Sequence, residues 1–207
     1  MKTIYEQTIE FFEDTHTYLV DGIITPSVTT IIKQIFPDKY KGISDAVLKR
    51  KAEFGTKGHS IIEMIGKNKM NKQEALNKIS ELYQMKEINQ DMFISLREYV
   101  RLCEKYDIDV LANEVIVAYG NKYAGTLDMI ANVKGKKSLI DIKFTAELDE
   151  EYLSWQEGMY DLASPETFEE YYCLWLPKGK VGKLAPIKTK TKEEILNMLE
   201  KVGNDDD

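Results

Sequence analysis

The fold is decided by residues 114–144, which read EVIVAYGNKYAGTLDMIANVKGKKSLIDIKF. Three runs in this stretch are rich in β-branched residues: Glu114–Tyr119, Ala124–Val133 and Ser138–Phe144. The segments Gly-Asn-Lys and Lys-Gly-Lys-Lys join these runs and carry residues that hairpin turns favour. The stretch therefore predicts an antiparallel meander of three strands.

The sequence on either side adds helices and further strands. Upstream, Asp21-Gly22 between two apolar runs predicts a hairpin, and helical spacing predicts helices at 28–36, 44–67, 72–85 and 89–106. The helix at 44–67 is expected as one piece or two, because Gly55 and Gly58 interrupt its pattern. Downstream, we expect a helix at 151–163, a strand at 168–176, its hairpin partner at 183–188 and a last helix at 192–202. With no repeat or linker, the sequence predicts a single α+β domain at residues 1–202 and a frayed acidic tail at 203–207.

The composition is that of an ordinary globular protein. Of 207 residues, 43% are hydrophobic and 30% are charged, which excludes a disordered chain and a membrane protein. The net charge of −7 argues against a protein that coats nucleic acid by charge alone. Cys103 and Cys173 are too few for a four-cysteine zinc or iron–sulfur site. Because the first residues lack an apolar signal segment, we expect the protein in the cytoplasm.

The residues best suited to chemistry lie on the second and third predicted strands. Residues two apart share one face of a strand, so Asp141 and Lys143 project together while Ile142 points to the buried side. The hairpin register can bring Asp128 to the same face. Two carboxylates suit Mg²⁺ or Mn²⁺. The alternative is an exposed salt bridge, and these residues by themselves leave both interpretations open.

Two further pairs lie four residues apart, a spacing that places side chains on one helix face. His59 and Glu63 form the first pair; imidazole ligates Mn²⁺ and acts as a base near neutral pH, whereas capping or packing is its plainer role. Gln156 and Tyr160 form the second pair and could hold a phosphate or a base. In the plainer alternative, Tyr160 packs and Gln156 faces water.

In chain order, these residues resemble the PD-(D/E)XK nucleases, specifically the RecB-like exonuclease branch that phages often encode. The resemblance rests on Gly55-Thr56 with His59 and Glu63, on Gly125-Thr126-Leu127-Asp128, on Asp141-Ile142-Lys143, and on Gln156 with Tyr160. The order and the spacing of the four motifs match that family. The resemblance implies a restriction-endonuclease-like core, in which helices flank a central mixed β-sheet.

The resemblance also implies a metal site for Mg²⁺ or Mn²⁺. Asp128 and Asp141 would be its carboxylate ligands, and the backbone carbonyl of Ile142 would be a further ligand. His59 would be the extra ligand that is typical of the RecB-like branch. Lys143 would orient or deprotonate the attacking water. Some relatives carry a four-cysteine iron–sulfur cluster, but with two cysteines we expect no cluster here.

Further residues are assigned to DNA or to the surroundings of the metal. By resemblance, Gln156 and Tyr160 would lie near DNA, while Glu63 and Glu114 would stand behind the ligands. Beyond these, a lysine-rich segment without acidic residues follows the aromatic strand, and we assign contacts with DNA phosphates to Lys178, Lys180 and Lys183. The alternative for these lysines is protection of an edge hairpin against pairing with other chains. A second candidate strip comprises Lys49, Arg50, Lys51 and Lys57.

The resulting hypothesis is a divalent-metal-dependent deoxyribonuclease, an exonuclease that acts on linear DNA ends in phage or prophage recombination or repair. Besides DNA, the expected partner is a phage single-strand annealing or recombination protein, and an oligomer is left open. The alternatives are a structure-selective or nicking endonuclease, a catalytically inactive DNA-binding module of the same fold, and an α+β interaction protein in which the motifs are coincidental.

Overall fold

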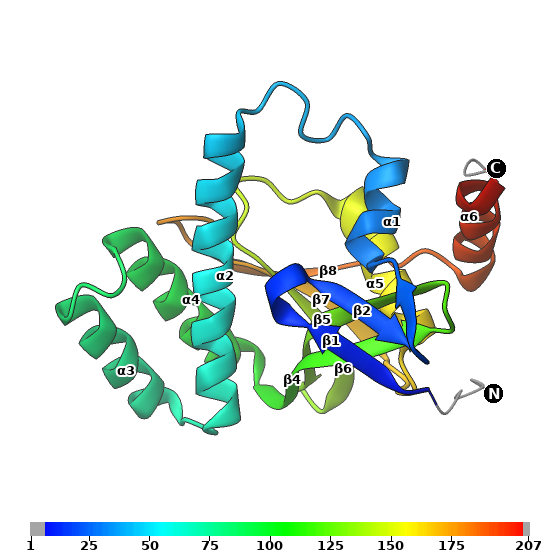
Figure 1. Ribbon diagram of the computed structural model, residues 1–207. Coiled ribbons are helices and arrows are strands. Elements are labelled where there is room, and N and C mark those ends of the chain that lie inside the picture. Colours follow the sequence, from blue (N-terminus) through cyan, green and yellow to red (C-terminus); the bar gives the residue numbers. More distant parts are fainter. Residues whose placement is uncertain (1–6, 205–207) are drawn as a thin grey trace.

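A five-stranded mixed sheet lies at the centre of the computed structural model, which describes residues 7–204 (Figure 1). Its strands, in spatial order, are β4 (Ile108–Tyr119), β5 (Tyr123–Val133), β6 (Lys136–Lys143), β7 (Glu170–Trp175) and β8 (Lys183–Pro186). Neighbouring strands run antiparallel except β6 and β7, which are parallel. The predicted meander and the predicted downstream hairpin are therefore confirmed.

The parallel pairing of β6 and β7 requires a crossover, which α5 (Glu150–Ala163) provides. Several strand boundaries differ from the predicted ones, and two of the differences have a local reason. β4 begins at Ile108 because the preceding helix, α4 (Gln90–Tyr106), is capped by Asp107, whose left-handed conformation turns the chain directly into the strand. β8 ends at Pro186, which has no backbone N–H for a strand ladder.

A separate three-stranded sheet is formed by β1 (Ile9–Phe12), β2 (Thr17–Val20) and β3 (Ile23–Thr25), with a short 3₁₀ turn, η1 (Glu13–Thr15), between the first two strands. The predicted hairpin is confirmed, since Asp21 and Gly22 both have positive φ. β1 is a strand that the sequence did not predict. The hydroxyl of Tyr18 lies 2.9 Å from that of Thr126, which fixes this sheet to β5.

The remaining helices are α1 (Val28–Ile35), α2 (Asp45–Lys67), α3 (Lys72–Gln84), α4 (Gln90–Tyr106) and α6 (Lys192–Asn204). Among the two possibilities left open for residues 44–67, the structure has one continuous helix. Polar caps begin several of these helices: the Ser27 side chain accepts from the backbone N–H of Thr30, and Asn71 and Glu74 form a capping box. α6 extends two residues into the predicted tail, and residues 205–207 lie outside the described part of the chain.

The helices cover both faces of the central sheet, so the chain forms one α+β domain. Figure 1 shows α3 and α4 on one side of α2, with α1, α5 and α6 on the other. On one face of the sheet, Ile62 and Leu96 share a buried cluster with Ile140. On the other face, Val28 and Met159 share a second buried cluster with Leu139. Each such fully buried side chain contributes roughly 1.5–3 kcal/mol of transfer free energy. Among residues 7–204, no helix combines the length and the apolar character that crossing a membrane requires.

Candidate metal centre

The candidate site begins where β5 and β6 separate. Pairing between these strands ends at Met129 and Ile140, which leaves the next backbone groups of β6 without a partner on β5. Asp128 replaces the missing strand partner, because its Oδ2 accepts a hydrogen bond of 2.6 Å from the backbone N–H of Ile142. The carboxylate of Asp128 is thereby held in a fixed orientation, with its second oxygen free to face the site.

Glu114 on β4 lies close to Asp128, and its backbone conformation is strained. Its φ of 50° is unusual for a non-glycine residue inside a strand. The other non-glycine residues with positive φ in the described chain lie in turns or at helix ends. The pairs on either side, Asn113 with Met129 and Val115 with Leu127, place Glu114 opposite Asp128. Strain at one strand residue that carries a carboxylate is typical of a functional position.

His59 completes a cluster of three potential ligands. Its Nδ1 lies 3.5 Å from Asp128 Oδ1 and 3.8 Å from Glu114 Oε1. One ligand atom from each of the three residues lies within 4.8 Å of the others. Opposite oxygen ligands of an octahedral Mg²⁺ lie about 4.2 Å apart, so small side-chain shifts bring this set to coordinating distance. One imidazole and two carboxylates are donors that suit Mn²⁺ as well as Mg²⁺.

The glycines of α2 explain how His59 comes so close to the sheet. A Cβ added at Gly58 would lie 2.3 Å from the ring of Phe144, and one added at Gly66 would lie 2.1 Å from Asn113 Oδ1. A side chain at either position would require the neighbouring Phe144 or Asn113 side chain, or the helix itself, to move. Asn113 also donates a hydrogen bond of 3.4 Å to the carbonyl of Asp128. Contacts that glycine permits therefore set the distance from α2 to the carboxylates.

The protonation of His59 reflects its two acidic neighbours. Burial lowers the pKa of the imidazole, but the charge of Asp128 and the nearby carboxylate of Glu114 outweigh burial and raise this pKa to about 9. An imidazole must lose its proton before it ligates a metal, so a cation at this site competes with a proton.

Asp141 and Lys143 form a partly buried ion pair beside the cluster, with Nζ 2.6 Å from Asp141 Oδ1. They do share one face, as predicted. The pair is not the exposed salt bridge of the alternative interpretation, because the Asp141 side chain is only 2% exposed. Burial and the charge of Asp128 raise the pKa of Asp141 to about 6, against the opposing effect of Lys143. Asp141 adjoins the three-residue cluster without belonging to it.

The charge of Lys143 is strongly favoured in this setting. Burial lowers its pKa, but Asp141 and then Asp128 outweigh burial and raise the pKa above its ordinary value. The predicted lowering of this pKa depends on a cation beside the ammonium group and stays a prediction. The role of the Ile142 carbonyl as a ligand also stays a prediction.

Gln156 and Tyr160 lie beneath the site rather than on the surface. Both are buried, and Gln156 Nε2 donates to Tyr160 Oη at 3.5 Å. The ring of Tyr160 packs so closely on Gly125 that a Cβ there would lie 2.8 Å away, which explains the glycine of that motif. The alternative in which Gln156 faces water is wrong. Contact of either residue with DNA stays a prediction.

Glu157 is the residue that the sequence analysis missed. It is 0% exposed, and neither oxygen of its carboxyl group has a hydrogen-bond partner in the described protein. Burial, and after it the charge of Asp141, raise its pKa well above the ordinary value. A charged residue type within a helix normally indicates a solvated face, so no sequence signal distinguishes this position.

The other predicted residues lie around the site or away from it. Glu63, one turn beyond His59, forms an ion pair of 2.5 Å with Lys67. Lys178 lies over the ring of Phe54 and 3.2 Å from Asp91. Lys183 begins the edge strand β8 and lies over Trp175, a position that also fits edge protection. Lys180 donates its backbone N–H to the carbonyl of Pro177. Their contacts with DNA stay predictions.

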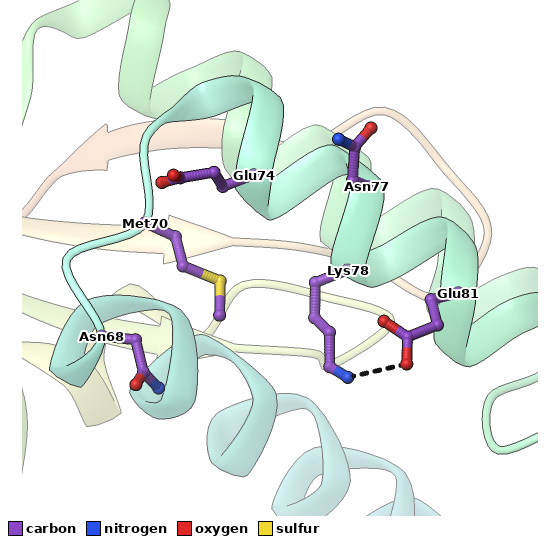
Figure 2. Close-up of a pocket in the computed structure, with 6 residues that line it drawn as sticks. All are labelled: Asn68, Met70, Glu74, Asn77, Lys78 and Glu81. Atoms are coloured by element: carbon purple, nitrogen blue, oxygen red, sulfur yellow. Dashed lines mark hydrogen bonds and ion pairs between the residues drawn. The ribbon is translucent and has the colours of Figure 1, made fainter.

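A separate pocket of about 440 Å³ lies where α2 ends and α3 begins (Figure 2). Its lining residues are Asn68, Met70, Glu74, Asn77, Lys78 and Glu81. Glu74 is occupied by the capping box of α3, and Glu81 is paired with Lys78. Asn68 follows His59 by nine residues, about 13 Å along a helix axis. This pocket is therefore no part of the carboxylate cluster.

Comparisons with known proteins add no family to this description. No protein-family model matches the chain, and no curated protein matches it.

Proposed function

We propose that the protein is a divalent-metal-dependent deoxyribonuclease of the PD-(D/E)XK type with a restriction-endonuclease-like core. The observation that carries the proposal is the convergence of His59, Glu114 and Asp128, with the Asp141–Lys143 pair next to them. The motif order in the sequence supports the RecB-like branch. The mixed sheet flanked by helices is compatible with that core.

The donor set fits a hard or borderline divalent cation. Two carboxylates and one imidazole converge from three different elements, and no thiol belongs to the cluster. We assign Glu114 a larger role here than the one first given to it, because it converges with His59 and Asp128 instead of lying behind them. Asp141 would join the set by turning away from Lys143.

The chemistry required for phosphodiester hydrolysis matches these residues. A divalent ion, when bound, acidifies water and offsets the charge that develops on the phosphate. The hydrogen bond from the backbone N–H of Ile142 holds Asp128 in place, so its other oxygen would reach the ion with little reorganisation. Lys143 holds an ammonium group beside the carboxylates, where it orients the attacking water or a phosphate oxygen.

The family resemblance extends the proposal to an exonuclease that acts on linear ends, in the cytoplasm, beside a phage annealing or recombination protein. The lysines at 178, 180 and 183 would hold DNA phosphates. A nicking or structure-selective endonuclease and an inactive binding module are the competing outcomes.

The test is nucleotide release from linear duplex and single-stranded DNA with Mg²⁺, with Mn²⁺ and with a chelator. We expect hydrolysis only with the ion, and loss of about 100-fold or more in Asp141→Ala and Lys143→Ala. Glu151→Gln, on the exposed side of α5, is the matched control and should keep full activity. Equal rates in wild type and both site variants would end the proposal. Cutting of closed circular DNA would favour an endonuclease, and metal binding without turnover would favour the inactive module.

A further inference from the structure

Three buried oxygen atoms on α5, at the adjacent residues Gln156 and Glu157, have no hydrogen-bond donor within the described part of the protein. In the described chain, Gln156 Oε1 and both carboxyl oxygens of Glu157 are the buried side-chain polar atoms that lack a hydrogen-bond partner. An unpaired polar atom in a protein interior costs on the order of 1–3 kcal/mol. Such a set of acceptors indicates that a donor reaches it in some state of the protein.

The group best suited to donate hydrogen bonds to these oxygen atoms is the ammonium group of Lys143. Asp141 and Lys143 lie on the face of β6 that α5 covers, because Leu139, two residues before Asp141, belongs to the same buried cluster as Met159 of α5. An ammonium group has three N–H donors, and one of them bonds to Asp141 Oδ1 at 2.6 Å. Lys143 therefore has two further N–H donors on the face of the sheet that α5 covers, and α5 carries the unpaired acceptors.

Under the proposed function, Asp141 pairs with Lys143 and also binds the cation. When Asp141 turns toward a cation beside Asp128, its Oδ1 no longer accepts from Lys143. A partly buried ammonium group left without a protein acceptor would be unfavourable. The carboxyl group of Glu157 on α5 removes this difficulty, because it can accept the hydrogen bond that Asp141 gives up, even when it is protonated.

We propose that Glu157 is a positioning residue, the alternative acceptor that receives the Lys143 ammonium group when Asp141 binds a divalent cation. This inference rests on the proposed function. Gln156 Oε1 lies next to Glu157 on α5 and offers a further acceptor. Lys143 then has two positions, one on Asp141 and one on Glu157, and in the second it stays at the site with its charge intact.

The direct test is a crystal structure of the full chain with Mg²⁺, alongside calorimetric titration with Mg²⁺. We expect Lys143 Nζ within hydrogen-bond distance of a Glu157 oxygen and Asp141 directed toward the ion. A Lys143 that stays on Asp141 with the ion bound, or a Glu157 that contacts only water, would overturn the inference. This test uses the wild-type protein, so it can be carried out even if substitutions at Glu157 prevent folding.

Kinetics of Glu157→Met and Glu157→Gln provide a second readout. Met removes both acceptors at similar volume, and we expect kcat to fall about 10- to 100-fold, with KM for DNA and the Mg²⁺ affinity within about twofold of wild type. Gln keeps one acceptor oxygen and should recover part of the loss. Glu151→Gln should match wild type. An unchanged kcat in Glu157→Met contradicts the inference alone, whereas a wild type that binds no Mg²⁺ removes the proposed function and the inference together.

Discussion

Asp128 and Ile142 are joined by a hydrogen bond of 2.6 Å, from the backbone N–H of Ile142 to the Oδ2 atom of Asp128, at the point where β5 and β6 separate. The other carboxyl oxygen, Oδ1, lies 3.5 Å from His59 Nδ1. One side chain thus both ends the pairing of two strands and faces the candidate metal ligands. The fold itself fixes the orientation of the central carboxylate.

Asp128→Asn should keep the hydrogen bond from Ile142 but remove the carboxylate oxygen that faces the candidate ligands. The amide oxygen can still accept from Ile142, so we expect the melting temperature to change little. The NH₂ group would then face His59 and cannot ligate a cation, so Mn²⁺ affinity should fall by about 100-fold or more. Calorimetric titration of wild type and variant measures this difference, and an unchanged affinity would remove Asp128 from the ligand set.

Gly58→Ala should destabilise the protein although alanine is the better helix former. The new Cβ would lie 2.3–2.8 Å from atoms of the Phe144 ring, and such overpacking costs roughly 1–3 kcal/mol. Gly55→Ala is the matched control on the same helix, because its Cβ would meet nothing within 4 Å. That change should stabilise the protein by up to about 1 kcal/mol.

Urea unfolding of both glycine variants checks this pair of predictions. Replacing Phe144 with leucine in the Gly58→Ala background should recover part of the lost stability, because the contact is with the ring. Equal stability changes at the two glycines would show that close approach of α2 to β6 does not require Gly58.

Much of this architecture follows from local patterns in the sequence. The meander and the hairpin at Asp21-Gly22 could be predicted because strand periodicity and turn residues act over a few positions. The continuity of α2 could not, because glycine weakens a helix locally while the contact between Gly58 and Phe144 is formed 86 positions away in sequence. Whether residues 44–67 form one helix or two therefore depends on tertiary packing.

The candidate site could be predicted only in part, because contacts between residues far apart in sequence leave no local pattern. Strand alternation placed Asp141 and Lys143 on one face, and the structure bears this out. The direct place of Glu114 in the cluster depends on a positive φ inside β4, which no residue pattern in that strand signals. The burial of Glu157 depends on how α5 packs against β6 and β7, and a helix pattern cannot reveal it.

The strained backbone of Glu114 predicts an unusual ranking of substitutions. Glycine adopts a φ of 50° without steric cost, whereas alanine pays about 1 kcal/mol there. We therefore expect Glu114→Gly to be at least as stable as Glu114→Ala, the reverse of the usual order inside a strand. Denaturant titrations of both variants measure the ranking. A clearly less stable glycine variant would argue that the strand relaxes once the glutamate is gone.

Glu157→Gln should change how stability depends on pH. Burial raises the pKa of Glu157 in the folded protein above its ordinary value of 4.5, so the unfolded chain ionises first. The wild type therefore loses stability as pH rises above about 4.5, up to the raised folded pKa. Glutamine does not ionise, so the variant should be the more stable of the two at pH 7–8, and the difference should shrink toward pH 4. Thermal unfolding across this range checks the sign, and a variant less stable at pH 8 than at pH 4, relative to wild type, would contradict it.

The most direct measurement of the central claim is the anomalous scattering of Mn²⁺ in crystals of the wild-type protein. The account predicts a Mn²⁺ peak about 2.0–2.3 Å from His59, Glu114 and Asp128, beside the Asp141–Lys143 pair. Saturating Mn²⁺ that leaves no peak there, or a peak only at other residues, would contradict the claim that these side chains form a metal centre.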